Sequence, residues 1–108
     1  MVKHIILWKI KEEYSETEKE SIRLGVKQGL EGLKGVVPGL IDIHVQTESL
    51  ESSTADLMLD STFENAEALK GYSVHPAHVE VANGKVRPYM ASRSCLDYEV
   101  SDNQEDWL

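Results

Sequence analysis

The stretch LIDIHVQTESLESSTADLMLDS, residues 40–61, sets the predicted fold of this chain. Apolar and polar side chains alternate over residues 40–47, which is typical of a half-buried strand. This alternation predicts one face with Leu40, Asp42, His44 and Gln46 and another with Ile41, Ile43, Val45 and Thr47. Residues 48–54 are a polar loop, and residues 55–61 again fit a strand. Two strands therefore follow one another with no helix between them.

A helix is predicted before this pair of strands. Ser15 and Glu18 form the capping box that opens it, and apolar side chains recur at helical spacing until Gly35. Three glycines interrupt this helix, namely Gly25, Gly29 and Gly32. Each weakens a helix by up to about 1 kcal/mol relative to alanine. They either permit close packing or are simply tolerated.

A second helical segment follows the pair and is broken near its middle. Residues 62–74 fit a short helix, which Pro76 cannot continue because proline lacks the amide hydrogen. Proline is favoured in a first helical turn, so residues 76–86 are predicted to begin a new helix.

Outer strands complete the pattern at residues 2–11 and 89–100. The order β-α-β-β-α-β indicates an α+β, ferredoxin-like protomer, with helices on one face of a four-stranded antiparallel sheet. Residues 1–100 are expected to form this domain. Residues 101–108 are expected to form an acidic C-terminal tail, in which Trp107 could dock on the domain.

The first and third strands carry apolar side chains on both faces, so both faces of the sheet are predicted to be covered. The helices cover only one of them. Packing two sheets face to face in a homodimer is the simplest cover for the other. We therefore expect a dimer.

Composition excludes several classes of partner. The 108 residues fit one domain, and 11 basic against 19 acidic residues give a net charge of −8. Nucleic acid and anionic membrane surfaces both reward positive patches, so neither is expected as a partner. We expect the cytoplasm as the compartment, because the sequence has a single cysteine and no pattern of a secretory leader. It also has no apolar run near the roughly 20 residues of a membrane span.

The segment 68–82 holds the strongest candidates for chemistry. Tyr72, His75 and His78 fall within seven residues. One hypothesis makes His78 a base next to a carbonyl, Tyr72 the donor to the developing enolate oxygen, and Asp97 the carboxylate that orients the imidazole. The alternative makes His75 the cap of the break at Pro76 and gives His78 a backbone partner. In it, the hydroxyl of Tyr72 lies at the surface.

Further pocket residues are expected on the first and last strands. His4 and Trp8 share one face of the first strand, and Arg93 and Asp97 share one face of the last. His4 either lines a pocket beside His78 or is a hydrogen-bonded or solvated histidine at the end of a strand. Arg93 either binds a carboxylate or pairs with Asp97. Cys95 is expected to be a small buried residue.

No metal or cofactor is expected. His4, His75, His78 and Asp97 could supply four ligands on paper, but the sequence contains no HExxH, CxxC or EF-hand pattern. His44 lies on the polar face of its strand and is expected to be exposed.

Four segments resemble one family: VKHIILWKIK, GLIDIHV, ADLMLDSTFENAEALKGYSVHPAHVEVA and SCLDYEV. Together they are similar to the stress-responsive dimeric α/β-barrel (Dabb) family, from residue 2 to residue 100. The resemblance implies a ferredoxin-like protomer and a barrel formed between two sheets. One plant branch consists of polyketide cyclases, in which a tyrosine and the second histidine of HPAH do acid–base work. By resemblance, these are Tyr72 and His78.

Three functions are left open. The first is a dimer that binds a small aromatic or keto-acid ligand in the barrel interior. The second is a cyclase-like enzyme acting on an aromatic or poly-β-keto substrate. The bulky apolar residues Trp8, Leu57 and Leu59 argue against this function, because such a site needs several polar groups. The third is a structural stress-response protein with no ligand, which predicts no cavity near His78.

Overall fold

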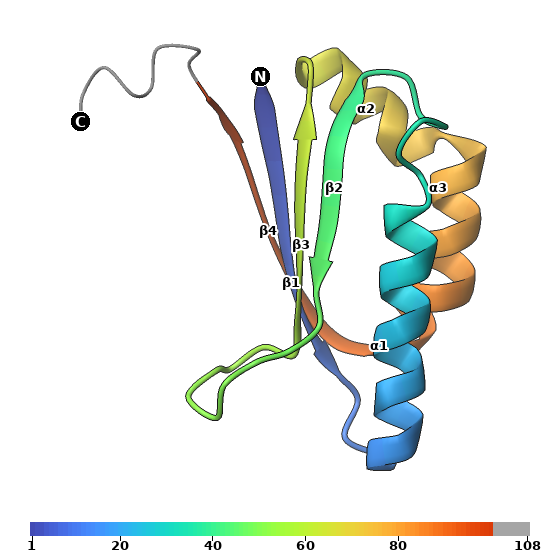
Figure 1. Ribbon diagram of the computed structural model, residues 1–108, viewed down its shortest axis with the longest axis vertical. Coiled ribbons are helices and arrows are strands. Elements are labelled where there is room, and N and C mark those ends of the chain that lie inside the picture. Colours follow the sequence, from blue (N-terminus) through green and yellow to red (C-terminus); the bar gives the residue numbers. More distant parts are fainter. Residues whose placement is uncertain (101–108) are drawn as a thin grey trace.

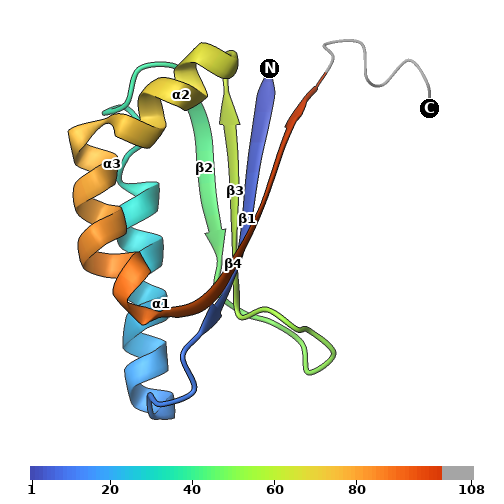
Figure 2. The same ribbon diagram turned by 180° about the vertical axis from the view of Figure 1, so that it is seen from behind.

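The computed structural model describes residues 1–100 as one antiparallel sheet with helices on one face (Figures 1 and 2). Strand order in the sheet is β2-β3-β1-β4. The strands are β1 (Val2–Ile10), β2 (Leu40–Gln46), β3 (Leu57–Phe63) and β4 (Met90–Glu99). The helices are α1 (Glu16–Glu31), α2 (Ala66–Val74) and α3 (Pro76–Val81), followed by a π turn η1 (Ala82–Val86) and a 3-10 turn η2 (Arg87–Tyr89). The ferredoxin-like prediction is confirmed.

Two expectations from the sequence concern the C-terminal tail and membrane-spanning helices. The expected acidic tail, residues 101–108 with Trp107, lies outside the residues that the structure describes. Within the described residues, no helix has both the length and the apolar character needed to cross a membrane.

Helix α1 begins with the predicted capping box. The Ser15 hydroxyl accepts from the Glu18 amide at 3.2 Å, and the Ser15 amide donates to the Glu18 carboxylate at 2.8 Å. One glycine of this helix is required by close packing against α3. A Cβ added at Gly29 would lie 2.8 Å from Cγ1 of Val81, closer than real carbon atoms approach. At Gly25, the nearest atom is the flexible end of Lys85, 3.7 Å away, so this glycine is only tolerated.

The break between α2 and α3 is made by His75. Its backbone is extended, and its Nδ1 accepts a hydrogen bond from the Ala77 amide at 3.1 Å. Pro76 then occupies the first turn of α3, as predicted. The capping hypothesis for His75 is therefore confirmed.

The strict alternation predicted for residues 40–47 is wrong at its first step. A bulge between Leu40 and Asp42 shifts the register of β2 against β3. As a result, Leu40 shares the helix-covered face with Ile43 and Val45, while Ile41 is 39% exposed. A bulge inserts one unpaired residue, and every side chain before it changes face relative to a regular strand.

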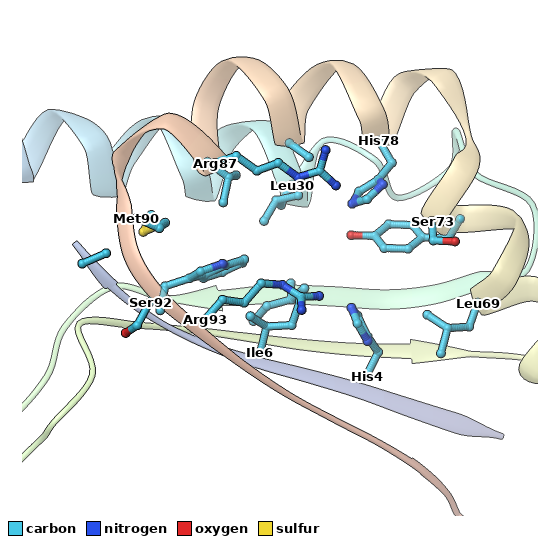
Figure 3. Close-up of a pocket in the computed structure, with 16 residues that line it drawn as sticks. His4, Ile6, Leu30, Leu69, Ser73, His78, Arg87, Met90, Ser92 and Arg93 are labelled. Atoms are coloured by element: carbon cyan, nitrogen blue, oxygen red, sulfur yellow. The ribbon is translucent and has the colours of Figure 1, made fainter. Parts of the chain in front are cut away.

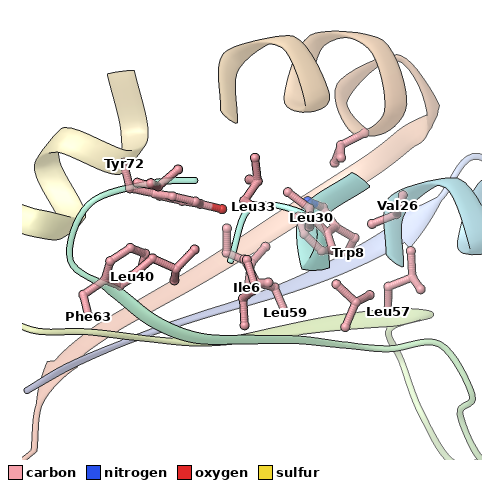
Figure 4. Packing of buried hydrophobic residues seen from close by; sticks show 14 of the residues in the cluster. Ile6, Trp8, Val26, Leu30, Leu33, Leu40, Leu57, Leu59, Phe63 and Tyr72 are labelled. Atoms are coloured by element: carbon pink, nitrogen blue, oxygen red, sulfur yellow. The ribbon is translucent and has the colours of Figure 1, made fainter. Parts of the chain in front are cut away.

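The core lies between the sheet and the helices (Figure 4). Alternate residues of β1 and β3 point into it, and α1 contributes Ile22, Val26 and Leu30. Phe63 and Tyr72 pack against each other with ring centroids 4.9 Å apart. We call this side of the sheet the covered face.

The edge strand β2 is closed by two side chains of α1. The carboxylate of Glu31 accepts from the Val45 amide at 2.9 Å, and the ammonium of Lys27 donates to the Val45 carbonyl at 3.0 Å. These two side chains also bond to each other at 2.8 Å. Because their hydrogen bonds occupy the backbone groups of Val45, this part of the edge is unavailable for pairing with another strand.

The side of the sheet away from the helices is bare, and we call it the open face (Figure 1). Leu7, Leu96 and Tyr98 are exposed there, and Leu96 is 62% exposed. Strand β4 is exposed along nearly its whole length. Apolar side chains gathered on one face of a sheet mark a surface suited to a partner.

Candidate functional site

A cavity of about 390 Å³ lies between the covered face and the helices (Figure 3). Its walls come from strands β1, β3 and β4 and from the helical segments α1, α2, α3, η1 and η2. The residues that line it include His4, Trp8, Tyr72, His78 and Arg93. We call this cavity the pocket. The pocket lies inside one protomer, on the side opposite the open face. A ligand between the two sheets of a dimer stays a prediction. The structural alternative, a stress-response protein without a ligand, predicted no cavity near His78, and this prediction is wrong.

Tyr72 and His78 form the inner wall of the pocket. Their rings lie 4.1 Å apart between centroids, tilted by 35°. Tyr72 is only 1% exposed, so the alternative that put its hydroxyl at the surface is wrong. Within residues 1–100, neither Tyr72 Oη nor His78 Nδ1 has a hydrogen-bond partner, although both atoms are buried. Buried polar atoms without partners are rare and costly, so this pair is unusual.

Burial shifts both groups toward their neutral forms. It raises the pKa of Tyr72 well above its ordinary value. It also lowers the pKa of His78, and the positive charges of Arg87, His4 and Arg93 act in the same direction, with the backbone of Ser73 opposing them. Near neutral pH, the Tyr72 hydroxyl therefore keeps its proton, and the His78 imidazole is in its neutral form.

The carboxylate of Asp97 orients His4, where the sequence had assigned it to His78. Its Oδ1 lies 2.5 Å from His4 Nδ1, and the two residues face each other across β1 and β4. His4 is buried while Asp97 is exposed. With Nδ1 engaged by Asp97, Nε2 is the atom of His4 left for a ligand.

Arg93 and Trp8 lie opposite each other in neighbouring strands and both line the pocket. The proposed pairing of Arg93 with Asp97 is not formed, since Asp97 bonds His4. A second arginine, Arg87, also lines the pocket and was missed by sequence reasoning. Nothing in the sequence marked it, because its place depends on the π turn that ends the helical segment.

Three other candidates lie outside the pocket or differ in exposure. His75 does not line it, because its ring caps α3. His44 is exposed as expected, and its ring lies 3.3 Å from the Glu31 carboxylate. Cys95 is exposed, which contradicts its expected burial. The cause is that β4 is an edge strand with little helix above it.

The four metal ligands considered from sequence do not converge, since His75 is a cap. A different trio, His4, Cys95 and Asp97, offers one nitrogen, one sulfur and one oxygen atom within 4.8 Å of one another. The His4 nitrogen in this trio is already bonded to Asp97. In residues 1–100, His4 and Asp97 therefore form a hydrogen-bonded pair at this position.

Comparison with known proteins identifies the family. The sequence pattern of the Stress responsive A/B Barrel Domain, Dabb, matches residues 2–100. The chain belongs to this family.

The chain is similar both to a characterised plant enzyme and to a solved structure of unknown function. The chain is 28% identical to olivetolic acid cyclase of Cannabis sativa over 81 residues, which cover 72% of this chain and 76% of the cyclase. A crystallised dimeric protein of unknown function with a ferredoxin-like fold, from Bacteroides fragilis, is 30% identical. That match covers 92% of this chain and 95% of the other, with a TM-score of 0.86.

A crystal structure from Arabidopsis thaliana is similar in fold. It is 27% identical, with a TM-score of 0.71, and the match covers 94% of this chain and 97% of that one. Fold and family are thus established over residues 2–100, but a shared fold does not fix the chemistry of the pocket.

Proposed function

We propose that this Dabb protein binds a small molecule in the pocket of each protomer. One observation carries the proposal: Tyr72 Oη and His78 Nδ1 are buried at the wall of a cavity of about 390 Å³, without partners in the described chain. That volume lies in the range of ligand pockets, roughly 300–1,000 Å³. A ligand oxygen that met these two atoms would supply the missing hydrogen bonds.

We further propose that the protein is a homodimer joined through the open face. Leu7, Leu96 and Tyr98 are exposed there and need a cover. The Bacteroides fragilis relative is described as dimeric. This arrangement leaves each pocket on the far side of its own sheet. The cytoplasm remains the expected compartment, and fractionation of cells that express a tagged chain tests it.

A second candidate function is proton transfer on a carbonyl compound, as in a polyketide cyclase. It is supported by the relative olivetolic acid cyclase and by the opposite pKa shifts of Tyr72 and His78. Neutral His78 is ready to take a proton from carbon beside a carbonyl, and protonated Tyr72 is ready to donate a hydrogen bond to the enolate oxygen. Pairs of groups whose environments separate their pKa values mark such roles.

The ring would close in the same site. The enolate carbon attacks a second carbonyl of the same molecule, and the oxygen formed there receives the proton that His78 removed. No atoms are gained or lost in this step. His4, held by Asp97 at Nδ1, is the neighbouring imidazole that positions the carbonyl compound through Nε2.

Histidine-ring NMR tests the binding proposal. The dimer is titrated with small aromatic and β-keto acids, and His78→Gln assigns the resonance. Binding in the pocket shifts His78 and His4 and leaves His44, which is exposed at the β2 edge, unmoved. A panel that moves none of these rings, or moves His44 alone, contradicts the proposal.

Turnover tests the cyclase candidate separately. Tyr72→Phe and His78→Gln are expected to slow ring closure of a linear poly-β-keto compound by about 10²–10⁴-fold, the usual contribution of a proton-transfer group. His44→Gln is the matched control and retains the rate. Saturable binding without any ring closure by the unaltered protein would leave the binding proposal standing and remove this candidate.

A further inference from the structure

The charge of the pocket is opposite to that of the chain. The chain has 19 acidic and 11 basic residues, yet no aspartate or glutamate of residues 1–100 lines the pocket. Two of the three arginines of the chain, Arg87 and Arg93, do line it. A positive site inside an acidic protein favours an anionic ligand.

The two arginines approach from opposite walls. Arg93 extends from β4 and Arg87 from the start of η2, and Figure 3 shows both side chains directed toward the end of the pocket that holds His78. They come from elements that are adjacent in sequence but on different layers. A ligand between them is therefore met by a guanidinium group from the sheet side and another from the helix side.

Neither arginine is neutralised within the described chain. None of the ion pairs of residues 1–100 includes Arg87 or Arg93. Arg87 donates only to the neutral side-chain oxygen of Asn83, at 2.6 Å. Two positive groups that face one cavity repel each other, so an anion between them removes a repulsion as well as adding attraction.

We propose that Arg87 and Arg93 form a clamp for the carboxylate of a small organic acid. The inference rests on the proposed function, because it names the class of ligand for the same pocket. A guanidinium group presents a planar fork of donors that matches the two oxygens of a carboxylate. The acid group then lies at the end of the pocket that holds Tyr72 and His78, and the carbon skeleton packs against the apolar wall of Ile6, Trp8 and Leu59. The ligand class is an aromatic or keto acid with its acid group at the arginines.

Calorimetric titration of acids against their neutral amides tests the clamp. The pairs are cinnamate with cinnamamide and benzoylacetate with its amide, in which a neutral amide of nearly the same shape replaces the carboxylate. Unaltered protein is expected to bind each acid at least about tenfold more tightly than its amide, as for hydrogen bonds between charged groups. Added salt is expected to weaken acid binding and leave amide binding unchanged.

Substitutions locate the effect. Arg93→Gln and Arg87→Gln are each expected to weaken acid binding by about tenfold, with amide binding unchanged. Arg93→Lys, which keeps the charge but loses the planar fork, is expected to be intermediate. Arg23→Gln is the matched control, because Arg23 lies on α1 away from the pocket. It is expected to leave both affinities unchanged.

The outcomes separate the clamp from the proposed function. Equal binding of acids and amides, insensitive to both substitutions, contradicts the clamp and leaves small-molecule binding intact. Absence of binding by every acid and amide at millimolar concentration contradicts both. Inorganic phosphate that displaces the acids at equal concentration also contradicts the clamp, since the pair would then hold any anion.

Discussion

The two faces of the sheet are built from the same strands and have different tasks. On β1, Ile6 and Trp8 are buried under the helices, whereas Leu7 between them is exposed on the open face. Polar side chains such as Lys3, Asp60 and Gln46 are interspersed on the open face, whereas the covered face of β1 to β3 is almost entirely apolar. The covered face encloses its own core and pocket, while the open face leaves Leu7, Leu96 and Tyr98 exposed.

The covered face is itself divided. Near β2 and β3 it is filled, with Val45 and Phe63 fully buried. Near β4 the helical cover ends, and polar side chains of His4, Tyr72 and His78 gather around the pocket. The filled part supplies stability, so the other part is free to keep buried polar atoms that a core would exclude.

The largest expected effect comes from the filled part. Phe63→Ala is expected to lower the free energy of unfolding by about 3–5 kcal/mol, because it removes a buried ring and leaves a cavity. Met58→Ala, on the open face of the same strand, is expected to cost less. Its cost is expected to depend on protein concentration if the proposed dimer covers that face. Urea unfolding at two protein concentrations measures both, and equal, concentration-independent losses would contradict the distinction between the faces.

The next effect concerns the open face alone. Leu96→Glu places a charge among exposed apolar side chains and is expected to convert the dimer to a monomer of 12.1 kDa. Light scattering at micromolar concentration gives the mass. Leu24→Glu is the control, because Leu24 is 55% exposed on α1, near the 62% of Leu96. A dimer that survives Leu96→Glu, or dissociates equally with Leu24→Glu, rules out the open face as the interface.

Most of the fold was predictable because its signals are local. The capping box of Ser15 and Glu18, the proline at the start of α3 and the alternation along β1 each act within a few residues. The bulge in β2 was not predictable, because Ile41 is as apolar as its neighbours. Its exposure results from pairing with β3, which the sequence of β2 does not record.

The pocket was predictable only in part, since His75 and Asp97 were expected there and do not line it. Tyr72, His78, His4, Trp8 and Arg93 do meet around one pocket. The partner of Asp97 depends on the register of β1 against β4, a pairing of residues 93 positions apart. Arg87 enters through a turn without a sequence signature. The relative positions of distant residues are thus what sequence patterns omit.

A third prediction concerns the pocket side of the covered face. Because burial lowers the pKa of His78, the folded state favours its neutral form. Its contribution to stability is fully present above the unfolded pKa of about 6.5 and is lost as pH falls through the lower folded value. His78→Gln is therefore expected to flatten the loss of unfolding free energy between pH 7 and pH 5, as followed by urea unfolding. Tyr72→Phe is the control, because its raised pKa lies far outside this range. An unchanged slope in His78→Gln would show that the histidine is not held neutral by the fold.

The smallest effect tests how closely the helices lie over the covered face. Gly25→Ala is expected to stabilise the protein by up to about 1 kcal/mol, because alanine favours a helix and the new methyl group has room. Gly29→Ala gains the same propensity but forces its methyl group against Val81, and such overpacking costs about 1–3 kcal/mol. Its net effect is therefore a small loss. Because Val81 and His78 lie on the same short helix, Gly29→Ala is also expected to shift the ring resonance of His78, whereas Gly25→Ala is not. If the two alanines stabilise equally and neither moves that resonance, the spacing of α1 and α3 does not control the pocket, and the covered face has more freedom than its packing indicates.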